Sequence, residues 1–147
     1  ESTKFIYTPF YNKVPFYGLS SLSREESLNF FKEDRFLFFN SDLLKVKKFQ
    51  IEIKTLDSLK LNCDFLKADV QGNEINTIKG AYETIKNSQP FIILERPSKD
   101  SEVAFLKEFG YEPYIYKKNI FVKGSNAYNV IFMTKNHKKL FSKKIFK

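Results

Sequence analysis

The chain has 147 residues, of which 42% are hydrophobic and 29% charged, a balance typical of one globular domain and not of a disordered segment. No run of residues approaches the roughly 18 apolar positions that a transmembrane helix needs. The first residues also lack the basic and apolar regions of a signal peptide, so the sequence predicts a cytoplasmic protein without a transmembrane segment. The single cysteine, Cys63, excludes an internal disulfide and a thiolate metal cluster.

The formal charge of +8 is concentrated near the end of the sequence. Six lysines lie in residues 135–147 and leave about +2 for the rest of the chain, so the charge alone predicts no specific nucleic-acid partner. We expect this basic tail to be solvated, and the alternative is contact with anionic lipid or nucleic acid. His137, the only histidine, lies in the tail and is also expected to be solvated, which leaves no basis for a histidine metal site.

Residues 1–60 are the least regular part of the sequence. A strand is predicted at 4–8, and Ser23 followed by Glu26 is the capping-box pattern of a short helix that ends near residue 32. Alternation of apolar and polar side chains predicts a second strand at 48–53. Six aromatic residues near the start of the chain fit either a core or the walls of an acceptor pocket: Phe5, Tyr7, Phe10, Tyr11, Phe16 and Tyr17.

Residues 61–134 have a more regular pattern of alternating strands and helices. The predicted elements are a strand at 65–70, a helix at 74–86, a strand at 91–94, a helix at 100–109, and strands at 111–116 and 128–134. The last two strands are joined by a loop too short for a crossover helix, so they should pair antiparallel. This order predicts an α/β sheet that is mostly parallel with an antiparallel end.

Acidic residues end two of the predicted strands, at the edge where open α/β sheets bind their ligands. Asp69 ends the strand at 65–70, and Glu95 ends the strand at 91–94. If these strands are neighbours, both carboxylates project from the same edge. Lys67 lies on the same side of its strand as Asp69 and can interact with it. From this local pattern alone, capping of the following helix is the favoured explanation for the first acidic segment.

The segment at 64–74, DFLKADVQGNE, resembles the signature of FkbM-type methyltransferases, and the resemblance continues through Ile78 to Ala81, PFIILE at 90–95, the Phe-Gly-Tyr at 109–111 and NVIF at 129–132. It implies a Rossmann-like methyltransferase fold with a seven-stranded sheet. It also implies transfer of a methyl group from S-adenosylmethionine to an oxygen of a small-molecule or glycan acceptor. By this resemblance the chain is the C-terminal portion of such a domain, with the fourth to seventh strands, and lacks the N-terminal cofactor-binding strands.

The resemblance also implies roles for particular residues. Asp69 and Glu95 would be catalytic residues. The cofactor would be bound by Asp69, Val70, Gln71 and Gly72. The acceptor would be bound by Lys67, Glu74 and Arg96, and no metal site is implied. Gln71 replaces the glutamate that is common in the family, and an amide cannot serve as a base. The five glycines form no glycine-rich loop, so we expect the chain alone to bind S-adenosylmethionine weakly.

The predicted layout is a partial methyltransferase domain at 1–134, made of a lead-in at 1–60 and a βαβαββ unit at 61–134, followed by the basic tail at 135–147. Three alternatives remain open at this stage. Asp69, Glu74 and Glu95 have the oxygen ligands to hold a magnesium or calcium ion. The chain can instead be a non-catalytic α/β binding module whose tail contacts nucleic acid or membrane. It can also be a half-domain that self-associates or is completed by another chain through an exposed sheet edge.

Overall fold

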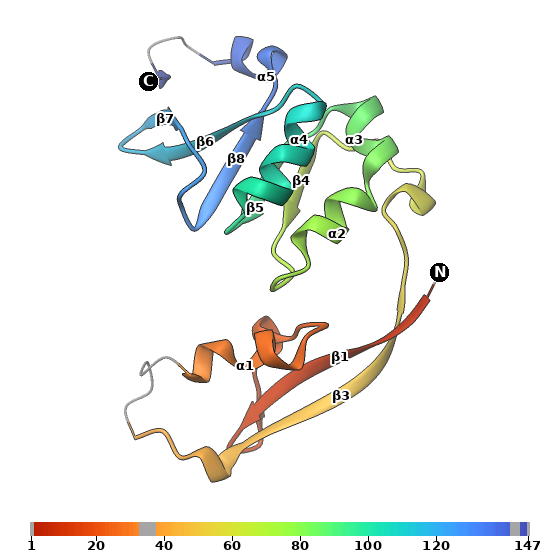
Figure 1. Cartoon of the computed structure of the whole chain (residues 1–147), viewed down its shortest axis with the longest axis vertical. Helices are drawn as coiled ribbons and strands as arrows, with labels where there is room; N and C mark the ends of the chain where they lie inside the picture. Colours follow the sequence, from red (N-terminus) through yellow and green to blue (C-terminus); the bar gives the residue numbers. More distant parts are fainter. Residues whose placement is uncertain (1, 33–37, 142–144, 147) are drawn as a thin grey trace. The chain divides into compact units, whose positions relative to one another are not determined.

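The computed structural model describes residues 2–32, 38–141, 145 and 146. The chain divides into two compact units: Glu1–Lys54 with Val70–Asn73, and Thr55–Asp69 with Glu74–Lys147. Each unit contains strands and helices and has a sheet of its own, so the chain is an α/β protein with two sheets (Figure 1). Among the described residues, no helix is long and apolar enough to cross a membrane.

The N-terminal unit is built on a long antiparallel ribbon. Its elements are β1 (Ser2–Tyr11), β2 (Val14–Pro15), the 3₁₀ turn η1 (Tyr17–Leu19), α1 (Arg24–Lys32), the 3₁₀ turn η2 (Ser41–Leu43) and β3 (Leu44–Ile53). Strands β1 and β3 pair along their whole length, and β2 adds a short third strand to β1 (Figure 1). The strands predicted at 4–8 and 48–53 are therefore confirmed, and both are longer than predicted.

Aromatic side chains form the small core of this unit. Phe31 of α1 is 8% exposed and contacts the rings of Tyr11, Phe16 and Phe39 at centroid distances of 5.4 to 6.4 Å. Helix α1 begins as the sequence predicts, since the Glu26 amide donates to the Ser23 hydroxyl at 3.3 Å. Two of the six aromatic residues near the start of the chain, Tyr11 and Phe16, therefore belong to this core.

The C-terminal unit holds a five-stranded sheet and its helices. Its elements are η3 (Asp57–Leu59), β4 (Phe65–Ala68), α2 (Glu74–Lys79), α3 (Tyr82–Ser88), β5 (Phe91–Glu95), the π-helical turn η4 (Lys99–Val103), α4 (Ala104–Glu108), β6 (Glu112–Lys117), β7 (Ile120–Lys123), β8 (Asn129–Met133) and α5 (Lys135–Lys139). The strand order across the sheet is β4-β5-β8-β6-β7. Strand β8, the last in the chain, lies in the middle of the sheet (Figure 1).

This sheet is mixed, and the prediction of a mostly parallel sheet is wrong for the described strands. Strands β4 and β5 are parallel, whereas β8 is antiparallel to both β5 and β6, and β7 is antiparallel to β6. The predicted antiparallel pairing of the strands at 111–116 and 128–134 is confirmed by β6 and β8. Strand β7 was not predicted. It follows a two-residue turn in which Lys118 and Asn119 have φ of 50° and 62°, the values of a type I′ hairpin.

The two faces of the sheet are covered by different parts of the chain. On one face, buried side chains of β4, β5 and β8 pack against Ile78, Ile85 and Leu106 from the helices α2, α3 and α4. On the other face, Tyr114 and Phe121 pack against aromatic and aliphatic side chains from the end of the chain. The sheet is therefore the centre of the larger core.

The end of the chain is packed where the structure describes it, which corrects the expectation of a solvated tail. Phe146 stacks on Phe121 with ring centroids 5.3 Å apart, and Phe141 contacts the same ring at 5.4 Å. His137 is half-buried against Phe91, and its Nδ1 accepts a hydrogen bond of 3.0 Å from the Thr134 amide. Burial lowers the pKa of His137, although a hydrogen bond with the Gln89 backbone opposes this effect. The lysines at 143, 144 and 147 lie outside the described residues.

The helix predicted at 74–86 is two helices, because the backbone breaks at Gly80 and Ala81. The Gly80 carbonyl accepts a hydrogen bond of 3.0 Å from the Asp57 amide, which belongs to a distant turn of the chain. The Asp57 carboxylate then accepts from the amides of Glu83 and Thr84 and from the Thr84 hydroxyl, at 2.8 to 3.0 Å. A side chain from η3 thus caps α3 at its first turn, and no periodicity within the helix itself indicates this.

Candidate functional site

Strands β4 and β5 bring the two predicted acidic positions to the same edge of the sheet. The two strands pair in parallel, and their last pair is Ala68 opposite Leu94. Asp69 directly follows Ala68, and Glu95 directly follows Leu94. Because side chains alternate along a strand, the buried residues Ala68 and Leu94 face the helices and the next residue of each strand faces the other way. The prediction that these two strands are neighbours in the sheet is confirmed.

The carboxyl groups of Asp69 and Glu95 interact, and the presence of Asp69 disfavours the charged form of Glu95. Burial and the interaction with Asp69 raise the pKa of Glu95, whereas a hydrogen bond from Tyr128 and the charge of Arg96 oppose the rise. The pair therefore binds a proton more readily than an isolated glutamate does, which is a useful property for a group that exchanges protons.

Three further side chains surround this carboxylate pair. Lys67 Nζ lies 3.0 Å from Asp69 Oδ2, and the pairing of these two residues expected from strand alternation is confirmed. The Tyr128 hydroxyl donates a hydrogen bond to Glu95, and this bond is the main reason why the pKa of Tyr128 is raised. The Arg96 guanidinium lies over the Tyr128 ring, 4.6 Å from its centroid, at a distance typical of cation–π contacts.

Tyr128 is the residue of this group that the sequence did not indicate. It directly precedes β8, which pairs with β5 so that Glu95 lies opposite Asn129. The backbone fixes the same contact, because the Arg96 amide donates to the Tyr128 carbonyl at 2.7 Å. Knowledge that β8 is the neighbour of β5 would have pointed to Tyr128, but strand order is not readable from the local pattern.

The sequence also predicted Glu74 as an acceptor-binding residue and considered it as a metal ligand. Glu74 is the first residue of α2 and is only 8% exposed. Among the described residues, no three histidine, cysteine or acidic side chains form a group that could hold a metal ion, so Asp69, Glu74 and Glu95 do not build the cation site considered from the sequence. Asp69 and Glu95 instead interact with each other, and Glu74 is placed where an acidic side chain stabilises the start of a helix.

The three remaining cofactor candidates, Val70, Gln71 and Gly72, belong to the N-terminal unit by their contacts. The Gln71 carbonyl accepts a hydrogen bond of 2.9 Å from the Ser21 hydroxyl. Gln71 and Gly72 have φ of 49° and 88°, so the chain reverses tightly there. A Cβ at Gly72 would lie 3.2 Å from Cγ of Glu26, and its φ also disfavours other residues, so this position requires glycine.

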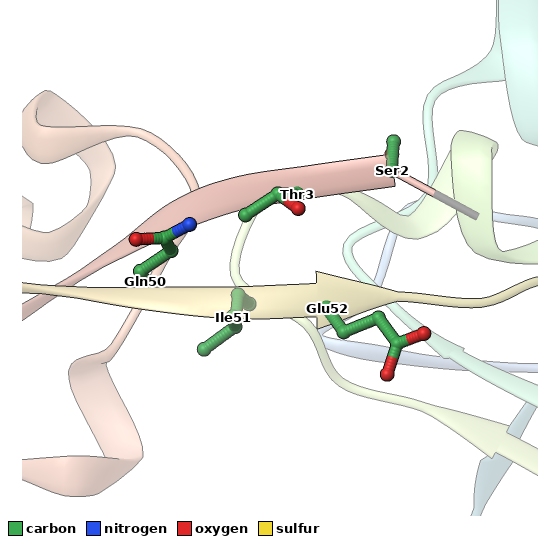
Figure 2. A pocket seen from close by; sticks show the side chains of 5 residues that line it. All are labelled: Ser2, Thr3, Gln50, Ile51 and Glu52. Carbon is green, nitrogen blue, oxygen red and sulfur yellow. The ribbon is translucent and has the colours of Figure 1, made fainter.

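Two surface depressions differ in their chemistry. A depression of about 500 Å³ lies on the ribbon of the N-terminal unit. Figure 2 shows the side chains that line it: Ser2, Thr3, Gln50, Ile51 and Glu52. It offers one carboxylate and no cationic side chain. In the C-terminal unit, a depression of about 360 Å³ is lined by Arg96, Pro97, Ser125, Asn126, Ala127 and Tyr128. This second depression shares Arg96 and Tyr128 with the surroundings of the carboxylate pair.

Comparison with known proteins gives one match. The model of the family described as the Methyltransferase FkbM domain matches residues 14–113, which is more than half of the chain. The matched range includes Lys67, Asp69, Glu95 and Arg96, whereas Tyr128 lies beyond it. No curated protein and no solved structure matches the chain.

Proposed function

The chain belongs to the FkbM methyltransferase domain family, and from this membership we propose that it serves the transfer of a methyl group from S-adenosylmethionine to an oxygen of a small-molecule or glycan acceptor. The observation that carries the proposal is the position of Asp69 and Glu95 at the carboxyl ends of two neighbouring parallel strands. Ligands of open α/β sheets bind at such ends. The family match does not favour the alternative of a non-catalytic binding module.

S-adenosylmethionine supplies an electrophilic methyl group on a positively charged sulfur. The proposal assigns Asp69, Val70, Gln71 and Gly72 to the cofactor. One feature supports the fit: a carboxylate suits a site for a cationic sulfonium. Gln71 contributes hydrogen bonds and no charge.

The acceptor hydroxyl must lose its proton when its oxygen takes the methyl group. In the proposed reaction the new carbon–oxygen bond forms as the carbon–sulfur bond breaks, and the hydroxyl proton passes to Asp69. Lys67, 3.0 Å from Asp69, stabilises the carboxylate form that is needed at the start. Glu95 interacts with Asp69, and this interaction favours uptake of a proton by the pair. Much of the acceleration comes from positioning the two reactants.

The proposal places the C-terminal unit within a Rossmann-like sheet. Strands β4, β5 and β6 run in the same direction, and among the described strands of this sheet β4 has a neighbour on one side only. This open edge supports further parallel strands beside β4, which would contribute most of the cofactor site. In this proposal residues 1–134 remain a partial methyltransferase domain, and the described part of the basic segment at 135–147 packs against its sheet. The same edge could instead pair with another chain.

The chain alone is expected to be inactive, so the test is the replacement of Asp69 by asparagine in a chain that also contains the cofactor-binding strands. We expect Asp69→Asn to lower methyl transfer about 10²- to 10⁴-fold, because an amide cannot take the hydroxyl proton. The measurement is transfer of labelled methyl groups from S-adenosylmethionine to a panel of sugars and hydroxylated small molecules. Asp64→Asn is the matched control, since Asp64 is an exposed acid at the opposite end of the same strand. Full activity of Asp69→Asn with an unchanged pH profile would exclude this role.

A further inference from the structure

The depression beside the carboxylate pair is built from two loops that the sheet holds together. One loop contributes Arg96 and Pro97 after β5, and the other contributes residues 125–128 before β8. The backbone hydrogen bond of 2.7 Å from Arg96 to Tyr128 joins the two loops directly. The antiparallel pairing of Glu95 with Asn129 continues this connection into the sheet, so both walls of the depression rest on central strands.

Arg96 is held in an uncommon backbone conformation at this point. Its φ of 42° lies in the left-handed region, which non-glycine residues rarely adopt and which costs roughly 1 kcal/mol or more. Residues kept in such conformations are concentrated at functional sites, where the surrounding structure stabilises them. The hydrogen bond to Tyr128 and the buried Pro97 provide that stabilisation here. The geometry thus presents a cationic side chain at a fixed place.

The guanidinium of Arg96 is also available for a ligand. Within the described part of the chain, no acidic side chain comes within ion-pair distance of it, and its nearest described contact is the face of the Tyr128 ring. A guanidinium stacked on an aromatic ring keeps its N–H groups at the rim, where a planar anion can accept two of them. Lys67 differs, because it is already paired with Asp69.

We infer that this depression is an acceptor subsite in which Arg96 binds a carboxylate or phosphate group of the acceptor while Ser125 and Asn126 hydrogen-bond to its hydroxyl groups. The inference rests on the proposed function and narrows the acceptor to hydroxylated small molecules or sugars that carry an anionic group. Among the described residues, Lys67 is paired with Asp69 whereas Arg96 has no acidic side chain within ion-pair distance, which leaves the charge of Arg96 for an anion.

The test compares three sugars that differ in charge. The intact chain is titrated with methyl β-D-glucuronide, glucose 6-phosphate and neutral methyl β-D-glucoside, and binding is followed by NMR signals of the Arg96 guanidinium and the Tyr128 ring. We expect at least one of the anionic sugars to bind ten times more tightly than the neutral glucoside. The carboxylate and phosphate arms identify which anion the site prefers.

The decisive variant is Arg96→Gln, which should reduce the binding of both anionic sugars to the level of the neutral glucoside. Glutamine tolerates this backbone, because Gln71 and Gln89 of the same chain have φ of 49° and 47°. Arg24→Gln, at an exposed arginine of α1, is the control and should keep the preference. Arg96→Lys is a second variant, which should retain part of the preference through its charge.

Two results would overturn the inference: equal affinity for charged and neutral sugars, which includes no binding of any of the three, or a preference that survives in Arg96→Gln. These outcomes are separate from those of the proposed function. Asp69→Asn should lose methyl transfer and still bind the anionic sugars. Tight binding of these sugars together with full activity of Asp69→Asn would refute the assigned base and leave the subsite intact.

Discussion

Glu95 is the residue whose titration should report most directly on the site. Its hydrogen bond from the Tyr128 hydroxyl stabilises the charged carboxylate and so lowers its pKa, against the upward effects of burial and of Asp69. Tyr128→Phe removes the hydroxyl and keeps the ring, so we expect the pKa of Glu95 to rise further. The measurement is a pH titration of the Glu95 carboxyl carbon by NMR.

Tyr116→Phe is a suitable comparison for this experiment. Tyr116 and Tyr128 are 55% and 54% exposed, but the hydroxyl of Tyr116 contacts Asn119 and not the carboxylate pair. We expect its replacement to leave the titration of Glu95 unchanged. A lower pKa of Glu95 in Tyr128→Phe would show that the hydroxyl does not donate to the carboxylate.

The sequence predicted which of these residues lie close together, but not all of them. The proximity of Asp69, Glu95 and Lys67 could be predicted because strand alternation and the position of strand ends are local properties of the sequence, and the roles of these residues stay predictions. Tyr128 was missed because its role depends on which strand lies next to β5. Glu74 was expected near the acceptor, but its burial at the start of α2 reflects tertiary packing, which its neighbours in sequence do not reveal.

Among the secondary-structure elements, α3 depends most clearly on one distant side chain. Burial would raise the pKa of Asp57, but its hydrogen bonds with Thr84 and with the Glu83 amide dominate and lower it. We expect Asp57→Ala to lower the free energy of unfolding by about 1–2 kcal/mol, as the loss of a helix cap does. Urea denaturation provides the measurement. Asp42→Ala, at an exposed acid in η2, should change stability little, and an equal loss in both variants would argue against the cap.

A group of charged residues ties α5 to β6. The Glu112 carboxylate accepts hydrogen bonds from Lys123, Lys138 and the Tyr114 hydroxyl, and these bonds lower its pKa to about 2. A carboxyl group with a lowered pKa in the folded state stabilises the protein above its ordinary pKa of 4.5. This contribution is lost as the pH falls from there towards 2.

Glu112→Gln should therefore make the melting temperature less dependent on pH between 5 and 2. At pH 7 we expect a modest loss of about 2–4 °C, because the side chain is 37% exposed and solvent screens its charge. Thermal unfolding followed by circular dichroism over this pH range measures both effects. The control is Glu108→Gln, at an exposed acid of α4. An unchanged pH slope in Glu112→Gln would contradict the assignment.

The elements that the sequence predicted wrongly share a physical cause. The periodicity of residues 74–86 is continuous, yet the helix breaks where Asp57 binds the Gly80 and Ala81 region from outside. Strand β7 follows a turn of lysine and asparagine, and its antiparallel pairing with β6 and the two positive φ values of the turn show the hairpin. In both places a contact formed in the folded chain overrides the local pattern.

The whole molecule contains two structures of different expected stability. In the C-terminal unit, Ile92, Leu94 and Val130 are completely buried at the centre of the five-stranded sheet. In the N-terminal unit, Phe5 and Phe49 on the long ribbon are 43% and 45% exposed. Since a ribbon of two strands has little stability of its own, its outer half depends on few buried contacts.

Hydrogen exchange should reveal this difference directly. We expect amides of β5 and β8 to exchange by global unfolding and to be the most protected in the chain. Amides of residues 2–6 in β1 should exchange at least 10-fold faster through local opening. Measurement of amide exchange by NMR or mass spectrometry tests this ranking, and equal protection of both sets would mean that the ribbon unfolds together with the central sheet.

The position of β8 also has a consequence for the order in which the protein can be made and folded. Synthesis proceeds from the N-terminus, so β5 and β6 leave the ribosome before the strand that must separate them. Until residue 133 has emerged, these two strands lack their shared partner, and Glu95 lacks Tyr128. A ribosome paused before that point would hold a nascent chain with the acids of the site already present and the site itself still unformed.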